Sequence, residues 1–296
     1  MHILYKDRVV ENVQKKALIV ANLNKEKAME ISNEVKKFLS KFAIASDVLY
    51  TATEFFEAES KKEYDLILSI GGDGTLLSVV HKFYSSLAPI FAINAGDLGF
   101  ITPFSFDDWK DGLKGFLEGK ATIKNEFLLN AELYNENGEL LFKEVALNDV
   151  SVQKSESSHL LLINAKSGEE RFAHGLAADG VVIATPIGST AYSMSAGGSV
   201  ILEGTNAFIF TPNAPFMAMD RGIVFPSSAV LKIELSEKQK APRASVDIDG
   251  RTCFKMQKKQ VLVIKKAKEI VRIVDNISFS DTERIGEKMM WKPQGD

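Results

Sequence analysis

"YDLILSIGGDGTLLSVV", residues 64–80, places one carboxylate, Asp73, among three glycines between two apolar runs. The apolar residues 66–70 predict a buried strand, and residues 75–80 predict the first turns of a helix. The glycine-rich loop therefore lies at the carboxyl end of a strand, where open α/β sheets bind ligands. Glycines there let a ligand approach the backbone closely, and the free N–H groups at a helix start favour phosphate.

A simple turn, in which Asp73 caps the following helix, is the alternative interpretation of Gly-Gly-Asp-Gly. Two standard phosphate motifs are absent from the sequence. No G-x-x-x-x-G-K-[ST] occurs, and Gly72-x-Gly74 is followed by Leu77 where a dinucleotide fingerprint has its third glycine. Three glycines in four residues between two apolar runs nevertheless favour a phosphate site of another kind.

The composition sets the class of protein. The 296 residues are 45% hydrophobic and 25% charged, which is ordinary for a globular protein and leaves room for two domains. With a formal net charge of -3, no global positive field recruits nucleic acid or an anionic membrane, so small molecules are the expected partners. Cys253 is the only cysteine, which excludes an internal disulfide framework. Without a signal-type apolar core or an apolar stretch of roughly 20 residues, the chain is expected in the cytoplasm.

Strand and helix patterns alternate along residues 1–123, which predicts an α/β domain with a doubly wound parallel sheet. The expected strands lie at 16–22, 47–50, 64–70 and 88–94, and the expected helices at 25–42, around Phe55 and Phe56, after the glycine loop and at 109–117. Residues 124–277 predict a β-rich domain, with Asn137-Gly138 as a type I′ hairpin signal. Residues 278–296 carry helix-compatible charges and are expected to pack back on the N-terminal domain.

A second segment that suits a polar ligand is "DGVVIATPIGSTAYSMSAGG", residues 179–198. Its strand at 181–184 runs into a turn of small residues, and Ser189 or Thr190 is expected to cap a short helix that begins near Ala191. A helix start after such a turn can bind an anion or a polar ligand. A capped surface helix is the alternative, but the segment has more hydroxyls than one cap needs.

Asn148 and Asp149 are neighbours in "VALNDVSV", an otherwise apolar and small strand. Adjacent strand residues point to opposite faces, so one of the two is expected to face inward. A buried amide or carboxylate needs hydrogen-bond partners, which ligand hydroxyls would supply. A β-bulge or a strand end is an equally simple explanation of the pair.

These three segments, in their order along the chain, resemble the bacterial ATP-NAD kinase family, whose members convert NAD to NADP. "IFAINAGDLGFIT" and "DIDGR" also match family segments. The glycine loop alone is shared with diacylglycerol kinases, sphingosine kinases and phosphofructokinases, whereas the 179–198 segment is long and specific. The resemblance implies NAD and ATP as substrates, a divalent cation, usually Mg²⁺, and a homo-oligomer, either a homodimer or a homotetramer.

The resemblance also implies roles for particular residues. The family's catalytic aspartate falls on Asp73, which would accept the proton of the adenosine ribose hydroxyl that attacks the γ-phosphate of ATP. The implied nucleotide-binding residues are Asp73, Gly74, Asn148, Asp149, His159, Ala177, Asp179, Thr190, Ala191, Tyr192, Ser193, Met194, Ser195, Ala214 and Arg251.

Some of these positions depart from the family pattern. Asp149 stands where Glu is usual, so its shorter side chain must reach further toward the ligand. Ala177 stands where a basic residue is common, and Arg251 lies near the place of a usual glutamine. His159 without its context would be a surface histidine at a strand end, and Asp249-Gly250 is first a hairpin turn and only second a ligand loop.

Two other classes of function share some of these features. A lipid kinase would have the glycine loop and a β-rich domain, but it needs an apolar channel for acyl chains, and the 179–198 segment is polar. A non-catalytic NAD-sensing module would bind the dinucleotide without turning it over. Formation of NADP from NAD and ATP separates both alternatives from an NAD kinase.

Overall fold

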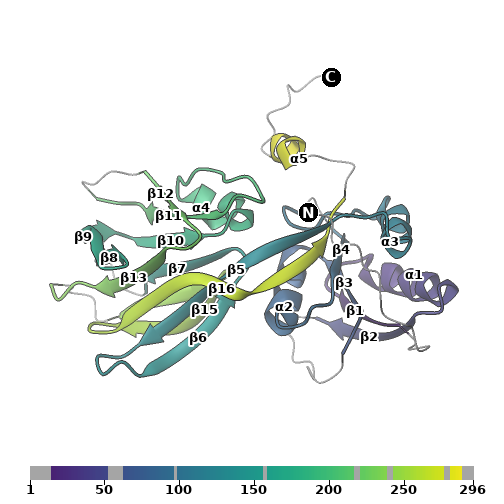
Figure 1. Cartoon of the computed structure of the whole chain (residues 1–296), viewed down its shortest axis with the longest axis horizontal. Helices are drawn as coiled ribbons and strands as arrows, with labels where there is room; N and C mark the ends of the chain where they lie inside the picture. Colours follow the sequence, from purple (N-terminus) through teal and green to yellow (C-terminus); the bar gives the residue numbers. More distant parts are fainter. Residues whose placement is uncertain are drawn as a thin grey trace.

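Two β-sheets form the framework of the protein (Figure 1). The structure, a computed structural model, describes residues 15–52, 63–96, 99–155, 159–216, 221–238, 243–276 and 281–288. It has an α/β part at the N-terminal end of the chain and a β-rich part after it, as the sequence predicts.

The first part alternates strands and helices. Its elements are β1 (Lys16–Asn22), α1 (Ala28–Lys41), β2 (Ala45–Thr51), β3 (Leu66–Gly71), α2 (Asp73–Phe83), β4 (Ile90–Asn94) and α3 (Trp109–Leu117). The four strands pair in parallel in the order β2-β1-β3-β4. The helix expected around Phe55 and Phe56 lies outside the described residues.

Helices cover both faces of this parallel sheet, so the sheet is doubly wound. Ile31 of α1 and Trp109 of α3 belong to one apolar cluster, whereas Leu76 of α2 belongs to another. Buried residues recur along α1 at spacings of three and four, because the helix turns one apolar stripe toward the sheet. This arrangement places the glycine loop at the carboxyl end of β3.

The rest of the chain is β-rich. Its strands are β5 (Ile123–Tyr134), β6 (Leu140–Ala146), β7 (Asp149–Lys154), β8 (Leu161–Ser167), β9 (Glu170–Ala178), β10 (Gly180–Ala184), β11 (Ala207–Asn213), β12 (Ile223–Pro226), β13 (Val230–Leu235), β14 (Arg243–Ile248), β15 (Arg251–Gln257) and β16 (Val261–Val274). A short 3-10 helix, η1 (Ile187–Thr190), and the helices α4 (Tyr192–Ser195) and α5 (Asp281–Lys288) complete the described elements.

One sheet runs through both parts of the molecule. β16 pairs in parallel with β4 at Ile273 and Ile90, and it pairs antiparallel with β5 and β13. Figure 1 shows the long strands β5 and β16 running side by side between the two parts. A second sheet, in the order β12-β11-β10-β7-β14-β15, packs on the first, since Leu129 and Ile264 of one sheet share an apolar cluster with Val152 of the other.

The β5–β6 hairpin forms as predicted, but its turn type differs. Gly138 has a φ of 81°, whereas Asn137 has no positive φ, so the turn is not type I′. The side-chain oxygen of Asn135 accepts hydrogen bonds from the N–H groups of Asn137 and Glu139, at 3.0 and 2.9 Å. These bonds hold a longer loop in place of the two-residue turn.

The capping of α4 is also different from the prediction. Among the residues that the structure describes, no side chain caps this helix, and its N-cap residue is Ala191. The hydroxyls of Ser189 and Thr190 donate instead to the carbonyl oxygens of Pro186 and Ile187, at 2.6 and 3.1 Å. The hydroxyls therefore stabilise η1, and the four-residue helix α4 is too short to serve as an anion site of its own.

A third apolar cluster joins α2 to the β-rich part. Leu76 and Val80 of α2 are buried in it, together with Leu147 and Ile187. Leu147 directly precedes Asn148, and Ile187 belongs to the 179–198 segment. The helix that follows the glycine loop thus shares one core with both segments that are expected to hold the dinucleotide.

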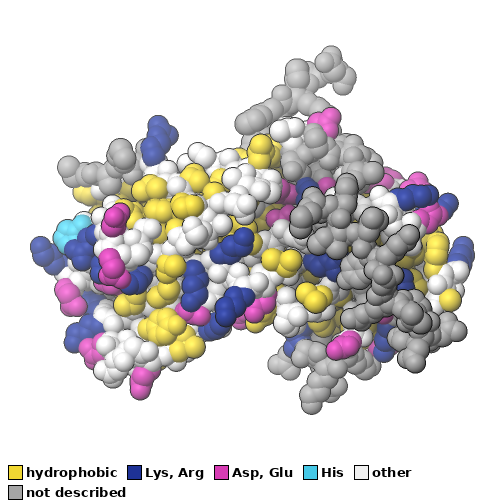
Figure 2. All heavy atoms as spheres, viewed as in Figure 1, with side chains coloured by type: hydrophobic (Ala, Val, Ile, Leu, Met, Phe, Trp, Pro, Cys, Tyr) yellow, Lys and Arg dark blue, Asp and Glu magenta, His cyan; other side chains and the backbone are white. Residues whose placement is uncertain are grey.

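The surface carries charges of both signs. Basic and acidic side chains are interspersed on the face drawn in Figure 2, in keeping with the formal net charge of -3. Within the described ranges, no helix is long and apolar enough to cross a membrane. The domain boundary at residue 123 and the packing of residues 278–296 on the N-terminal domain stay predictions.

Candidate active site

Asp73 is the first residue of α2, but its carboxylate bonds to a loop outside the helix. Oδ2 accepts a hydrogen bond from the N–H of Phe100 at 2.6 Å. Oδ1 accepts from the N–H of Ile101 at 3.1 Å and from the hydroxyl of Thr102 at 3.2 Å. Gly72 occupies the N-cap position, and no side chain of the described residues caps the helix. The helix-cap interpretation of Asp73 is therefore wrong, and Asp73 instead fixes the loop that follows β4.

Gly99 makes this contact possible. A Cβ built at position 99 would overlap the hydroxyl of Thr102 and approach Oδ1 of Asp73. Only a residue without a side chain lets the loop come this close to the carboxylate. The glycine therefore helps to hold Asp73 in a single orientation.

A cavity of about 560 Å³ lies beside the glycine loop, and its lining includes Asn24, Lys25, Lys27, Asn94 and Gly96. Lys25 reaches toward the loop. A Cβ built at Gly96 would lie 3.2 Å from Nζ of Lys25, and one built at Gly72 would lie 3.8 Å from its Cε. An ammonium group next to the backbone N–H groups of a helix start suits a polyphosphate.

Asn148 and Asp149 lie at the start of β7. The Asp149 side chain is 4% exposed, which confirms that one member of the pair faces inward. Oδ1 of Asn148 is buried and has no hydrogen-bond partner within the described part of the chain. The Asn148 backbone is fixed by Thr185, whose N–H donates to the Asn148 carbonyl oxygen at 2.9 Å. Asn148 therefore presents an unsatisfied oxygen from a fixed backbone, which a ligand site can use.

A second cavity, of about 340 Å³, opens onto this pair. Its lining is Asn148, Asp149, Ser151, Gln153, Ala191, Tyr192, Asp247, Asp249 and Gly250. The Tyr192 hydroxyl donates to Oε1 of Gln153 at 2.9 Å and accepts from Nδ2 of Asn213 at 2.8 Å. Four of the predicted site residues, Asn148, Asp149, Ala191 and Tyr192, thus meet at one polar cavity.

The Asp149 carboxyl is electrostatically unusual. Burial raises the pKa of Asp149 to about 7, and the negative charges of Asp249 and Asp247 add to this effect. Near neutral pH the group is partly protonated, so it can donate a hydrogen bond as well as accept one. Hydroxyl groups, which also do both, are suitable partners for it.

The other predicted residues lie on neighbouring elements and do not line the 340 Å³ cavity as the described residues define it. Gly74 is in α2, and His159 is exposed before β8. Ala177 is the last but one residue of β9, Asp179 directly follows that strand, and Thr190 ends η1. Ser193, Met194 and Ser195 lie in α4, Ala214 follows β11, and Arg251 begins β15. Asp179 forms an ion pair with Lys154 at 2.6 Å. Ser193 is buried and shares a hydrogen bond with Thr211 at 2.9 Å.

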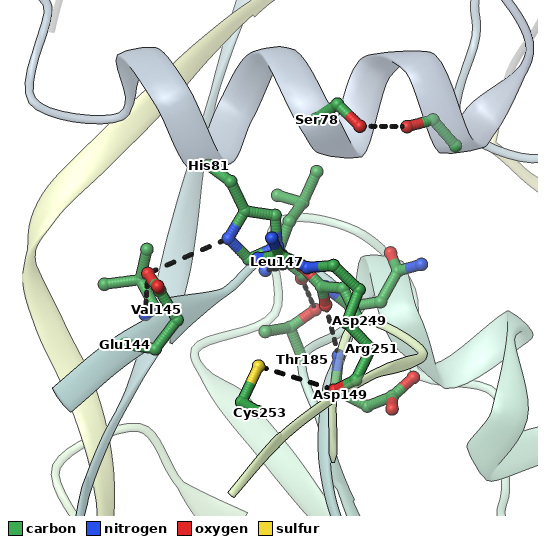
Figure 3. Close-up of polar contacts among 12 residues, drawn as sticks. Ser78, His81, Glu144, Val145, Leu147, Asp149, Thr185, Asp249, Arg251 and Cys253 are labelled. Atoms are coloured by element: carbon green, nitrogen blue, oxygen red, sulfur yellow. Dashed lines mark hydrogen bonds and ion pairs between the residues drawn. The ribbon is translucent and has the colours of Figure 1, made fainter. Parts of the chain in front are cut away.

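Asp249 makes contacts that its sequence context does not predict. Its carboxylate accepts hydrogen bonds from the N–H groups of Leu147, Asn148 and Asp149, at 2.9, 2.8 and 3.0 Å (Figure 3). The Asp249-Gly250 hairpin turn itself is confirmed, with φ values of 48° and 78°. The turn pattern does not predict that Asp249 also fixes the backbone of residues 147–149, because only the tertiary structure shows which groups the carboxylate contacts.

A doubly wound sheet with a glycine loop, a cavity beside that loop and a second, polar cavity at Asn148 and Asp149 are the features of a phosphotransferase that acts on a nucleotide. Two family models match the chain. That of the ATP-NAD kinase N-terminal domain covers residues 43–121, and that of the C-terminal domain covers residues 147–276. The chain therefore belongs to the ATP-NAD kinase family, and its activity is that of an ATP-dependent NAD kinase.

Individual relatives agree with this assignment. The chain is 34% identical to an NAD kinase of Treponema denticola over 278 residues, which cover 94% of this chain and 96% of that protein. It is 33% identical to an NAD kinase of Chlorobium phaeobacteroides over 282 residues, 92% of this chain and 96% of the relative.

Two solved structures share the fold. Yeast NADH kinase complexed with NADH superposes with a TM-score of 0.81 at 21% identity, over 96% of this chain and 90% of the other. An NAD kinase from Archaeoglobus fulgidus in complex with ATP superposes with a TM-score of 0.72 at 22% identity, over 93% and 97%.

Proposed function

We propose that Asp73 is the catalytic base of the NAD kinase reaction and that Asn148 and Asp149 hold the dinucleotide. The hydroxyl at the 2′ position of the adenosine ribose attacks the γ-phosphorus of ATP. A new oxygen–phosphorus bond forms, the bond to the β-phosphate oxygen breaks, ADP leaves with the electron pair, and Asp73 takes the hydroxyl proton. A positioned general base of this kind contributes typically about 10²–10⁴-fold to the rate.

The observation that carries the proposal is the shared core of α2, Leu147 and Ile187. It attaches the helix that begins at Asp73 to the two segments around the polar cavity. The reacting hydroxyl and its base belong to different parts of the sequence, so a rigid connection between them is what proximity catalysis needs.

The ATP side of the site uses the glycine loop and its surroundings. Backbone N–H groups around Gly72 and Gly74, together with the Lys25 ammonium, suit the triphosphate chain. The structural neighbour in complex with ATP supports a nucleoside triphosphate as the phosphoryl donor.

A divalent cation, preferably Mg²⁺, would be held by Asp73 together with the phosphates of ATP. No group of three or more His, Cys, Asp or Glu side chains gathers as a metal cage among the residues that the structure describes. Mg²⁺ is commonly held by one or two carboxylates and the phosphates of the substrate, with water completing its shell. Asp73 is the carboxylate that would take part, and the cation would offset the negative charge of the phosphates.

The dinucleotide side uses the buried polar groups of the second cavity. The unpartnered Oδ1 of Asn148 and the partly protonated Asp149 suit ribose hydroxyls or an amide of the ligand. The ring of Tyr192 supplies a flat surface for a base or ribose. The neighbour complexed with NADH supports a dinucleotide in this fold.

Further proposals concern the working form of the enzyme. We expect a homodimer or homotetramer that acts in the cytoplasm, and size-exclusion chromatography with light scattering measures the oligomer. Incubation with NAD, ATP and Mg²⁺ followed by an enzymatic assay for NADP tests the function. A lipid kinase would form no NADP, and a sensing module would bind NAD in calorimetry without converting it.

A further inference from the structure

His81 lies near the end of α2, the helix that begins at Asp73, and it contacts the β-rich part (Figure 3). Its Nε2 is 2.9 Å from Oδ2 of Asp249, and its Nδ1 is 3.8 Å from Oε1 of Glu144. The side chains of His81 and Asp249 are 7% and 1% exposed. This ion pair is shielded from water, and charge interactions are stronger in the protein interior than in water. The pair therefore connects α2 to the turn between β14 and β15.

Asp249 in turn fixes the segment that carries Asn148 and Asp149. One carboxylate oxygen, Oδ1, accepts the N–H groups of both residues, and Oδ2 accepts the N–H of Leu147 and faces His81. A displacement of the Asp249 side chain would therefore move the backbone of three successive residues. His81 thus contacts the residue that fixes the backbone of Asn148 and Asp149.

Three charged groups face His81 from the elements packed against it: Glu144 of β6, Asp249 of the hairpin turn and Arg251 of β15. Burial alone lowers the pKa of His81, and so does the charge of Arg251. The carboxylates of Asp249 and Glu144 outweigh both, so the net effect is a raised pKa. A positively charged His81 compensates the buried charge of Asp249, which would otherwise be costly.

We propose that His81 is a positioning residue for phosphoryl transfer: through Asp249 it sets the position of Asn148 and Asp149 relative to Asp73. The inference rests on the proposed function, in which Asn148 and Asp149 hold the dinucleotide. Loss of the ion pair loosens the backbone of this pair, whereas the glycine loop belongs to the α/β part. NAD binding should therefore weaken while ATP binding is preserved.

Steady-state kinetics and calorimetric titration with NAD test the proposal on His81→Leu and His81→Gln. The exposed His174 supplies the matched control, His174→Gln. In His81→Leu, KM and Kd for NAD should rise about 10–100-fold, the effect of removing a partner of a buried charge. His81→Gln should show a smaller rise, because its amide can still donate a hydrogen bond. KM for ATP should be unchanged, and the control should match the wild type.

The pH dependence separates positioning from a merely structural role. As the pH rises through the raised pKa of His81, the wild-type side chain loses its positive charge and becomes neutral, as glutamine is. The Kd for NAD of His81→Gln, divided by the wild-type Kd, should therefore fall toward one. Asp149 titrates in both proteins and largely cancels from the ratio. A ratio that is constant with pH, or equal increases of KM for NAD and ATP with a lower melting temperature, would overturn the proposal.

A double-mutant cycle with Asp249→Asn tests the route through Asp249. If His81 acts through this carboxylate, adding His81→Gln to Asp249→Asn should raise the Kd for NAD no further. Additive increases would show that His81 does not act through Asp249. Calorimetry measures binding without turnover, so a wild-type protein that binds NAD but forms no NADP would count against the proposed function and leave this test valid.

Discussion

Gly188 lies so close to Asn148 that a Cβ built at position 188 would overlap the Asn148 carbonyl oxygen. The same carbonyl accepts the N–H of Thr185, and the Thr185 hydroxyl donates to the carbonyl of Leu147 at 2.6 Å. The turn of the 179–198 segment thus packs closely on the backbone of Leu147 and Asn148. A glycine at position 188 is a requirement of this close approach.

Gly188→Ala should therefore lower both stability and NAD affinity. Forcing a methyl group against the Asn148 backbone costs about 1–3 kcal/mol, as overpacking does elsewhere. Thermal melts and the KM for NAD measure the two effects. The control is Gly115→Ala in α3, where a Cβ would meet nothing within 4 Å. That change should stabilise the protein by about 0.5–1 kcal/mol, because alanine favours a helix over glycine. Equal melting temperatures for the two variants would contradict the close fit at position 188.

Asp149→Asn should make the stability less dependent on pH. The pKa of Asp149 is about 7 in the folded protein against a model value of 3.8, so the folded state binds more protons between these values. Stability is then lost as the pH rises from about 4 to 7. Relative to the variant, the wild type should lose roughly 1–3 kcal/mol between pH 5 and pH 8.

Urea unfolding at the two pH values measures this difference. Asp111→Asn, which removes an exposed carboxylate from α3, controls for the change in net charge. If the free energy of unfolding of each variant differs from that of the wild type by the same amount at both pH values, Asp149 is not a carboxyl with a raised pKa.

Tyr192 should contribute to NAD binding through its ring rather than through its hydroxyl. The hydroxyl is already engaged by Gln153 and Asn213, whereas the side chain lines the polar cavity. Tyr192→Ala should raise KM for NAD by about tenfold or more, the effect of losing a large aromatic surface, and leave KM for ATP nearly unchanged. Tyr192→Phe should have a much smaller effect. The exposed Tyr50 on β2 gives the control Tyr50→Ala.

Kinetics with varied NAD and varied ATP distinguish the outcomes. A rise of both KM values together with a lower melting temperature would make Tyr192 a core residue. A Tyr192→Phe variant as impaired as Tyr192→Ala would mean that the hydroxyl contacts the ligand.

Local sequence patterns predict much of the fold. The apolar run before the glycines is the buried strand β3, and the helix predicted at 109–117 has the bounds of α3. Strand alternation predicts that one member of the Asn148-Asp149 pair faces inward, and Asp149 does. These features are predictable because each depends on residues that are neighbours in sequence.

The contacts of the polar side chains are not predictable in this way. Asp73 resembles a helix cap in sequence, yet its partners are N–H groups of a loop that follows another strand. Ser189 and Thr190 are good capping residues that bond to the preceding turn instead. His81 and Asp249 meet only because the turn between β14 and β15 lies against α2. Each of these contacts depends on tertiary packing, which overrides the local preference.

Asp73→Asn should abolish most phosphoryl transfer while NAD binding persists. Asparagine cannot accept a proton at neutral pH, so kcat should fall at least about 100-fold. Some loss of stability is also expected, because both carboxylate oxygens accept hydrogen bonds from the 100–102 loop. With one oxygen replaced by an amide nitrogen, a donor faces a donor, which costs about 1–3 kcal/mol.

Steady-state kinetics, calorimetry with NAD and a thermal melt belong together for this variant. A near-normal kcat would contradict the proposal that Asp73 acts as a base. A variant that still binds NAD and is folded at the assay temperature, with kcat reduced as stated, supports it. Varying the Mg²⁺ concentration separates two ways in which the carboxylate could act. Excess Mg²⁺ should partly restore kcat if Asp73 mainly binds the cation, and it should not do so if Asp73 takes the proton, because added metal cannot replace a base.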